Sequence, residues 1–156
     1  MAIEKVREYL AAFGADRRII EFPVSSATVE QAAEAAHCEA ARIAKTLSFM
    51  LDGQAILVVL AGDAKIDNPK YRAQFGGKVK MLSPEQAEEL VGHAVGGVCP
   101  FAVNDGVRVY LDISLKRFPT VFPACGSCNS AIEVTIPQLE EYSRFVSWVD
   151  VGKGWA

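Results

Sequence analysis

Two apolar segments separated by only two residues constrain the fold of this chain most strongly. Ile43–Leu51 and Gln54–Ala61 each have the length and composition of a strand, and Asp52-Gly53 between them is a typical hairpin turn. The second segment is apolar on both faces, which predicts a central strand covered on both sides. The sequence therefore predicts a sheet that continues beyond this hairpin and is flanked by helices.

Lys45 is the exception within the first of these strands. Side chains alternate between the two faces of a strand, so Lys45 shares a face with Leu47, Phe49 and Leu51. That face is otherwise apolar, and lysine is almost never fully buried without a partner. Two interpretations stay open: Lys45 extends its amine to water at the strand end, or it lines a cleft and presents a cation to a ligand.

Composition places the chain among ordinary globular proteins. With 156 residues, of which 51% are hydrophobic, we expect a single domain over residues 1–156. No apolar run is long enough for a membrane span, and Met1–Phe13 is amphipathic rather than signal-like, so we expect a cytoplasmic protein without a membrane partner. The formal charge of −3 gives no overall nucleic-acid footprint. A basic stretch from Lys65 to Lys80 is a local candidate, with a solvated loop as the simpler interpretation.

Four cysteines are present, and in a reducing compartment free thiols or ligands are expected rather than disulfides. Cys125 and Cys128 form a lone C-x-x-C sequence, which supplies only half of a structural zinc site. Cys99 and His93 have no zinc-module spacing relative to it. We therefore expect no metal and no cofactor, and we interpret the C-x-x-C as a turn.

The remaining pattern alternates helices with short strands and indicates an α+β fold. Three helix starts carry capping boxes, Thr28 with Gln31, Ser83 with Gln86 and Thr135 with Gln138. The expected elements are helices from residue 3 to 13, from 28 onward, from 83 to 92 and from 138 to 142, and strands at 19–24, 79–82, 107–112, 131–136 and 145–151. The 107–112 strand is expected to form a second hairpin with Ala102-Val103.

Two further features suggest a binding site. Val95–Phe101 contains two adjacent glycines and a proline, and glycines allow backbone N–H groups to approach a ligand closely enough to hold a carbonyl oxygen or oxyanion. A plain turn is the alternative. Asp112 ends its strand, where it could pair with Lys45 across a cleft or cap the following turn.

Four stretches in this order resemble the YbaK/EbsC family of aminoacyl-tRNA deacylases, a module that also occurs as the editing domain of bacterial prolyl-tRNA synthetases. They are Thr28 to Phe49, which includes Arg42-Ile43-Ala44-Lys45-Thr46-Leu47; Leu57 to Asp63; Val95 to Phe101, with the G-x-x-x-P pattern at Gly96 to Pro100; and Val109 to Asp112 followed by Gly126 and Asn129 to Glu133. Ala102 departs from the family, where glycine is common, and the Cys125/Cys128 pair is unusual.

The resemblance implies an α+β fold with a curved, mixed and mostly antiparallel sheet. It implies hydrolysis of the ester that joins a wrong amino acid to the 3′ end of a tRNA. Lys45, Gly96 and Gly97 then correspond to the catalytic positions. The substrate-binding positions that the resemblance implies are Thr46, Val98, Cys99, Pro100, Phe101, Asp112 and Gly126.

These expectations define one hypothesis and two alternatives. The first is a trans-editing deacylase for a small amino acid such as alanine, cysteine or proline, acting by positioning and backbone stabilisation of the oxyanion. Its partners would be mischarged tRNA and, in addition, an aminoacyl-tRNA synthetase, with no DNA involved. The alternatives are a non-catalytic module that binds tRNA ends, and a C-x-x-C thiol or metal protein. The edited amino acid and the oligomeric state stay open.

Overall fold

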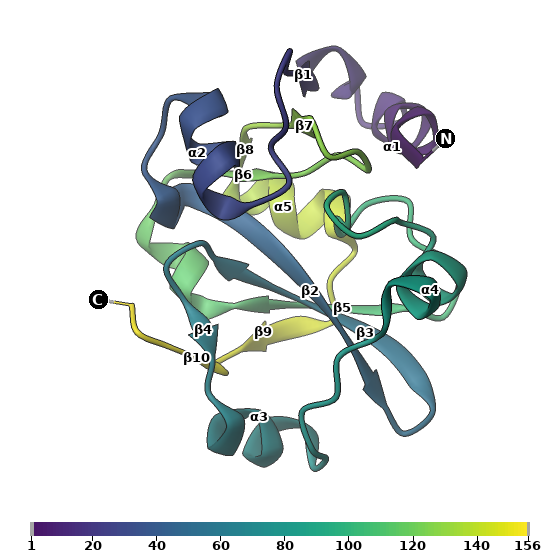
Figure 1. Cartoon of the computed structure of the whole chain (residues 1–156), viewed down its shortest axis with the longest axis vertical. Coiled ribbons are helices and arrows are strands. Elements are labelled where there is room, and N and C mark those ends of the chain that lie inside the picture. Colours follow the sequence, from purple (N-terminus) through teal and green to yellow (C-terminus); the bar gives the residue numbers. More distant parts are fainter. Residues whose placement is uncertain (1, 156) are drawn as a thin grey trace.

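The fold is built on a six-stranded mixed sheet in which the predicted hairpin is central (Figure 1). A computed structural model describes residues 2–155. The strand order is β8-β6-β2-β3-β5-β9. The strands are β2 (Ile43–Leu51), β3 (Gln54–Ala61), β5 (Arg108–Asp112), β6 (Thr120–Pro123), β8 (Val134–Thr135) and β9 (Ser147–Val149).

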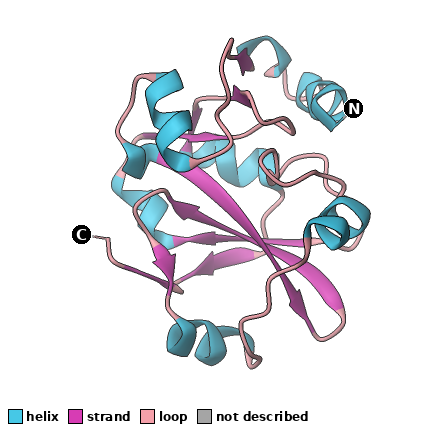
Figure 2. Ribbon diagram, viewed as in Figure 1, coloured by secondary structure: helices cyan, strands magenta, loops and turns pink. Residues whose placement is uncertain are grey.

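Two small ribbons and a set of helices complete the molecule (Figure 2). The ribbons pair β1 (Ile20–Glu21) with β7 (Ser130–Ala131) and β4 (Lys65–Ile66) with β10 (Gly152–Lys153). The helices are α1 (Ala2–Ala11), α2 (Val29–Ala36), α3 (Asn68–Phe75), α4 (Pro84–Gln86) and α5 (Ile136–Ser143). Short helical turns are η1 (Asp16–Arg18), η2 (Ala40–Arg42), η3 (Ala87–Val91) and η4 (Ile113–Arg117).

Both faces of the sheet are covered, as the doubly apolar β3 predicts. One face packs against α1 and α5, with Leu10 and Leu139 fully buried, and the other packs against α3 through Tyr71. A third small cluster joins α2 to the start of β2 and to Phe122 of β6. The predicted α+β fold with a curved mixed sheet is confirmed. Within the six-stranded sheet, however, β2–β6, β3–β5 and β5–β9 are parallel pairs.

The capping boxes at Thr28, Ser83 and Thr135 are all present, and the strands β2 and β3 have the predicted bounds. The prediction of a second hairpin is wrong. Strand β5 lies between β3 and β9 and pairs with both in parallel, and Ala102-Val103 forms no strand. The expected strand at 79–82 is reduced to a single bridge between Phe49 and Met81. The expected strand at 131–136 is shorter and broken, because residues 130–131 pair with β1, residues 134–135 pair with β6, and Ile136 begins α5.

Ala102 adopts a φ of +53°, in the left-handed region that favours glycine. This conformation would suit the glycine that the family resemblance leads us to expect at this position. No helix within residues 2–155 combines the length and apolar character that a membrane span requires.

Asp112 anchors the C-terminal segment to the end of β5. Its carboxylate is fully buried and accepts hydrogen bonds from the backbone N–H of Ser114 at 3.0 Å and of Val151 at 2.9 Å. Of the two predicted roles, the structure therefore shows the cap of the following turn. The bond to Val151 also fixes the start of β10 beside β4.

Replacement of Asp112 by Ala is expected to lower the free energy of unfolding by about 3 kcal/mol, because each buried donor left unpaired costs about 1–3 kcal/mol. Asp112→Asn retains one acceptor oxygen and should give a smaller loss. The exposed Asp105 provides the control, and Asp105→Ala should change stability by less than about 0.5 kcal/mol. Denaturant unfolding measures all three, and equal effects of Asp112→Ala and Asp105→Ala would contradict the anchoring role.

Candidate active site

A cavity of about 230 Å³ lies where the start of β2 meets α2, β6 and the glycine loop, defined here as Val95–Phe101. Its wall contains Lys45, Thr46, Gly96 and Val98 among the residues that the sequence singled out. The remaining lining residues are Ser26, Ala27, Thr28, Val29, Ala32, Ile43, Ala44, Leu47, Phe122, Ala124, Ser130 and Ala131. The lysine of β2 and the first glycine of the loop therefore face the same space.

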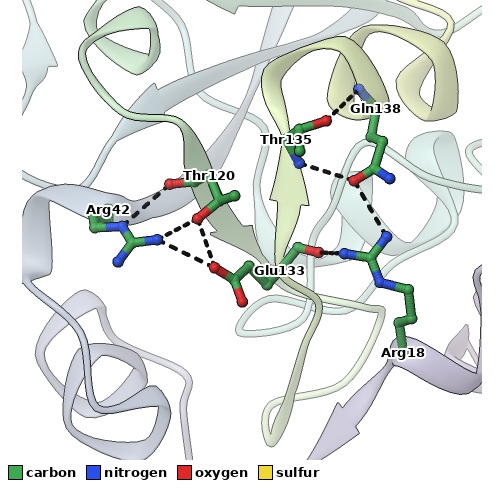
Figure 3. A network of polar contacts seen from close by, with 6 residues as sticks. All are labelled: Arg18, Arg42, Thr120, Glu133, Thr135 and Gln138. Atoms are coloured by element: carbon green, nitrogen blue, oxygen red, sulfur yellow. Dashed lines mark hydrogen bonds and ion pairs between the residues drawn. The ribbon is translucent and has the colours of Figure 1, made fainter.

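The strand β2 is held on both sides at this end. Lys45 lies opposite Leu60 of β3, while Ile43 and Ala44 pair in parallel with Phe122 and Pro123 of β6. The polar network in Figure 3 reinforces the second contact: the Arg42 guanidinium donates to the backbone oxygen of Thr120 at 3.2 Å and to its hydroxyl.

The same guanidinium forms an ion pair with Glu133 at 3.3 Å and lies 5.2 Å from the ring centroid of Phe122. Arg18 extends the network by donating to the backbone oxygen of Glu133 and to the side chain of Gln138, which caps α5 (Figure 3). These contacts fix the floor of the cavity at Phe122.

The side chain of Lys45 is half-buried, and its ammonium group has no hydrogen bond or ion pair with any of residues 2–155. Burial lowers the pKa of the ammonium, the Asp63 carboxylate raises it, and the Lys65 ammonium lowers it further. Asp63 does not pair with Lys45, because Arg117 holds it at 2.5 and 2.9 Å, and this hydrogen bonding lowers the pKa of Asp63. Lys45 therefore presents to the cavity a cation that has no direct ion-pair partner among the described residues.

Thr46 adds a second unused polar group. Its hydroxyl oxygen is buried and has no hydrogen-bond partner among the described residues. A buried hydroxyl without a partner costs free energy unless a ligand or water completes it. Since Thr46 also lines the cavity, it offers a ready contact to a polar ligand.

The two glycines of the loop differ in their placement. Gly96 lines the cavity with a φ of +96°, and neither its N–H nor that of Val98 has an acceptor among the described residues. Gly97 is buried away from the cavity, and its N–H donates to the Ala94 oxygen at 3.0 Å. Gly96 and Val98 are thus the cavity-lining residues of the loop whose N–H groups have no acceptor among the described residues.

Gly97 is required for the contact between two loops. A Cβ at this position would lie 2.6 Å from the Ser127 nitrogen and 2.7 Å from the Gly126 carbonyl carbon. Gly126 in turn has a φ of +90°, and its own added Cβ would lie 3.0 Å from Val6 of α1. Gly97 and Gly126 therefore support the glycine loop from behind rather than line the cavity.

The other predicted site residues are also outside the cavity lining. Cys99, Pro100 and Phe101 form the buried C-terminal part of the loop, and Asp112 is buried where it accepts hydrogen bonds from the backbone N–H groups of Ser114 and Val151. Burial raises the pKa of the Cys99 thiol to about 12, so this sulfur stays protonated and is a poor nucleophile. Cys125 is buried and Cys128 exposed, both as free thiols, and the described residues contain no cluster of metal-binding side chains.

His93 closes the base of the glycine loop. Its imidazole is fully buried, and Nε2 lies 2.8 Å from the backbone oxygen of Phe101 and 3.5 Å from the Cys99 sulfur. The other ring nitrogen, Nδ1, is buried without a partner. Burial lowers the pKa of His93, which keeps the ring neutral where a charged ring would be left unpaired.

Sequence reasoning missed most of the cavity wall. Phe122, Ser130 and the residues from Ser26 to Ala32 come from segments that meet only through the parallel β2–β6 pair and the packing of α2. The capping box at Thr28 located the helix start but not its position beside Lys45. No local pattern in the sequence carries that information.

The comparisons with known proteins agree with this geometry. The sequence profile of the aminoacyl-tRNA editing domain matches residues 24–142, so the chain belongs to the aminoacyl-tRNA editing domain family. The matched range contains both Lys45 and the whole glycine loop.

The chain is also similar to individual proteins in sequence and in structure. Uncharacterized protein YwhH of Bacillus subtilis is 54% identical over 156 residues, 99% of each chain. The proline–tRNA ligase of Lactiplantibacillus plantarum is 28% identical over 90 residues, which are 57% of this chain and only 16% of that enzyme. A crystal structure of a candidate trans-editing enzyme for prolyl-tRNA synthetase superposes with a TM-score of 0.88 at 29% identity, covering 98% of both chains.

Gly97→Ala is expected to destabilise the protein by several kcal/mol, because the new methyl group would overlap backbone atoms that cannot rotate away. Gly106→Ala is the matched control: its φ of +87° is also unfavourable for alanine, but the added Cβ would meet nothing within 4 Å, so a loss of about 1 kcal/mol is expected. Thermal or denaturant unfolding compares them, and a smaller effect at Gly97 would refute the loop contact.

His93 is expected to make stability pH-dependent. Its pKa is lowered in the folded state, so below about pH 6.5 the unfolded chain binds a proton that the native state resists, and stability falls as pH falls. His93→Gln should flatten this dependence between about pH 7 and 5. His37→Gln, at the exposed second histidine, should retain the wild-type dependence in urea titrations across this range.

Proposed function

We propose that this protein is a trans-editing deacylase that hydrolyses the ester between a small amino acid and the 3′ end of a mischarged tRNA. One observation carries the proposal: the unpaired ammonium of Lys45 and the open amides at Gly96 and Val98 line a single cavity. Membership of the editing-domain family and similarity to the candidate trans-editing enzyme support the same reaction class. The proposed cellular location is the cytoplasm, with an aminoacyl-tRNA synthetase as an additional partner.

The proposed mechanism depends on positioning and charge stabilisation. The N–H groups of Gly96 and Val98 donate to the ester carbonyl oxygen and stabilise the negative charge that develops on it. Lys45 neutralises the terminal phosphate or fixes the terminal ribose. Water attacks the carbonyl carbon, the ester C–O bond breaks, and the ribose oxygen leaves with the proton that the water gives up. Where a hydroxyl or thiol of the substrate attacks instead, its proton passes to the ribose oxygen, and water then hydrolyses the resulting ester or thioester.

The size and lining of the cavity support a small substrate side chain. The volume of about 230 Å³ lies below the usual range of about 300–1,000 Å³ for drug-sized ligands. Its apolar wall includes Val29, Ala32, Ile43 and Phe122, held from behind by the Arg42 network. We propose alanine, cysteine or proline esters as the candidates, in agreement with the sequence expectation.

A binding module without turnover is the second candidate, and one observation favours it. Among the described residues that line the cavity there is no histidine, carboxylate or cysteine that could act as a general base or nucleophile. Such a module would hold an aminoacylated 3′ end and protect it. Hydrolysis of any mischarged tRNA by the wild-type protein decides between the two.

Lys45→Ala is expected to reduce deacylation at least about 100-fold, the loss typical when one preorganised charge-stabilising group is removed. Stability should be unchanged or slightly increased, because a half-buried, unpaired charge is removed. The assay measures release of labelled alanine, cysteine and proline from tRNA, with wild type and variant at equal concentration.

Cys99→Ala and Lys80→Ala serve as controls, since the Cys99 thiol lies outside the cavity and Lys80 is exposed near the far end of β2. Both should retain activity within about threefold. An inactive Cys99→Ala variant beside an active Lys45→Ala variant would reverse the assigned roles. A wild type that hydrolyses none of the three esters but binds them would favour the binding module.

A further inference from the structure

The ribbon formed by β4 (Lys65–Ile66) and β10 (Gly152–Lys153) has a charge arrangement that stability does not explain. Lys65 and Lys153 are direct cross-strand partners, and both side chains are exposed. Like charges placed opposite each other in an antiparallel pair are destabilising. Neither lysine forms an ion pair with any of residues 2–155.

Nearby carboxylates do not compensate these lysines, because each has another partner. Asp63 is held by Arg117, and Asp150 forms an ion pair with Lys70 at 3.0 Å. Asp67 accepts from the Lys70 backbone N–H at 3.0 Å as the cap of α3 and forms no ion pair with either lysine of the ribbon. The ribbon therefore presents two cations that are free to bind an external anion.

The ribbon begins at the wall of the cavity. Ala61, at the end of β3, pairs with Ala44, next to Lys45. Gly62 follows, and a Cβ there would lie 2.0 Å from the Ala40 oxygen and 2.8 Å from Val29, a cavity-lining residue. A tight turn closed by the bond from Ala64 N–H to the Ala61 oxygen, 2.9 Å, then leads directly into Lys65.

The ribbon is also rigidly placed, although it contains only two residues per strand. The Val151 N–H donates to buried Asp112 and the Val151 oxygen accepts from the Asp67 N–H at 2.8 Å. The Lys70 ammonium donates to the Gly152 oxygen at 3.0 Å. A Cβ at Gly152 would lie 3.1 Å from the Asp112 carboxylate, so the strand packs closely on this anchor.

We infer that the β4–β10 ribbon is a phosphate-binding surface for the 3′ strand of the tRNA, with Lys65 and Lys153 contacting phosphodiester groups just upstream of the nucleotide that enters the Lys45 cavity. This inference rests on the proposed function for its choice of nucleic acid. A row of cations that continues from a cavity matches a single strand, whose backbone charges follow one another at regular intervals. Phosphate contacts of this kind position a substrate without reading its sequence.

The test compares Lys65→Ala/Lys153→Ala with a control, Lys78→Ala/Lys80→Ala, which removes the same charge from exposed lysines near the far end of β2. The probe is unacylated tRNA for proline, full-length or lacking its 3′-terminal CCA, and Kd is measured by fluorescence anisotropy as a function of salt. For full-length tRNA, the ribbon variant should bind about tenfold more weakly near 0.1 M salt, and its salt slope should fall by about 1.4, about 0.7 per single-strand phosphate contact.

Two comparisons make the outcome decisive. Truncation of CCA should weaken wild type and the control alike but weaken the ribbon variant less, because its phosphate contacts are already lost and only the contact of the terminal nucleotide with the Lys45 cavity is left to remove. An unchanged Kd and slope for the ribbon variant, an equal loss in the control, or equal sensitivity of the ribbon variant to truncation would each overturn the inference. In deacylation, the ribbon variant should raise KM and leave kcat unchanged.

This binding assay is independent of turnover, so the two proposals fail separately. Wild type that binds through the ribbon but hydrolyses no ester removes the deacylase proposal alone. The ribbon inference alone is removed if the wild type is active and Lys45→Ala is inactive, but the ribbon variant binds tRNA with normal affinity.

Discussion

The two-sided pairing of β2 is the constraint on which the site depends. Its antiparallel partner β3 and its parallel partner β6 fix the strand from both edges, so Lys45 cannot move toward water by shifting the register. A shift by one residue would transfer every side chain of the strand to the opposite face, and Phe49 would leave the core. The stability of the sheet therefore holds the Lys45 ammonium in a half-buried position that is energetically unfavourable by itself.

The glycine loop is held by backbone packing rather than by a network of side chains. Gly97 contacts the backbone at Gly126 and Ser127 directly, while His93 joins the two ends of the loop through the Phe101 oxygen. Neither contact uses the amides of Gly96 and Val98, two cavity-lining residues whose N–H groups have no acceptor among the described residues. This separation lets the loop be rigid at its base and unsatisfied at the surface where an oxyanion would bind, as preorganised stabilisation requires.

Sequence patterns predicted those parts of the fold that are determined locally. The capping boxes, the Asp52-Gly53 turn and the bounds of β2 and β3 follow from short-range chemistry, and all of them are present. The parallel pairs were beyond reach, because strands such as β5 and β9 are joined by long connections that leave no periodic signal. Lys45 and Gly96 could be singled out because each departs from its local pattern. Phe122 and Ser130 reach the cavity only through long-range pairing, which the sequence pattern does not show. Asp112 could be assigned two roles, but the sequence could not decide between them.

The family match covers residues 24–142 and leaves a segment at each end of the chain outside it. Residues 24–142 contain the complete cavity wall, but α1, which packs beneath Gly126, and β10, which carries Lys153, lie outside it. Helix α1 packs into the core through the buried side chains of Val6 and Leu10, whereas β10 is attached at the edge through β4 and the Asp112 carboxylate. A change confined to these outer segments would therefore alter the packing behind Gly126 or the charge of the ribbon without replacing any residue of the cavity wall.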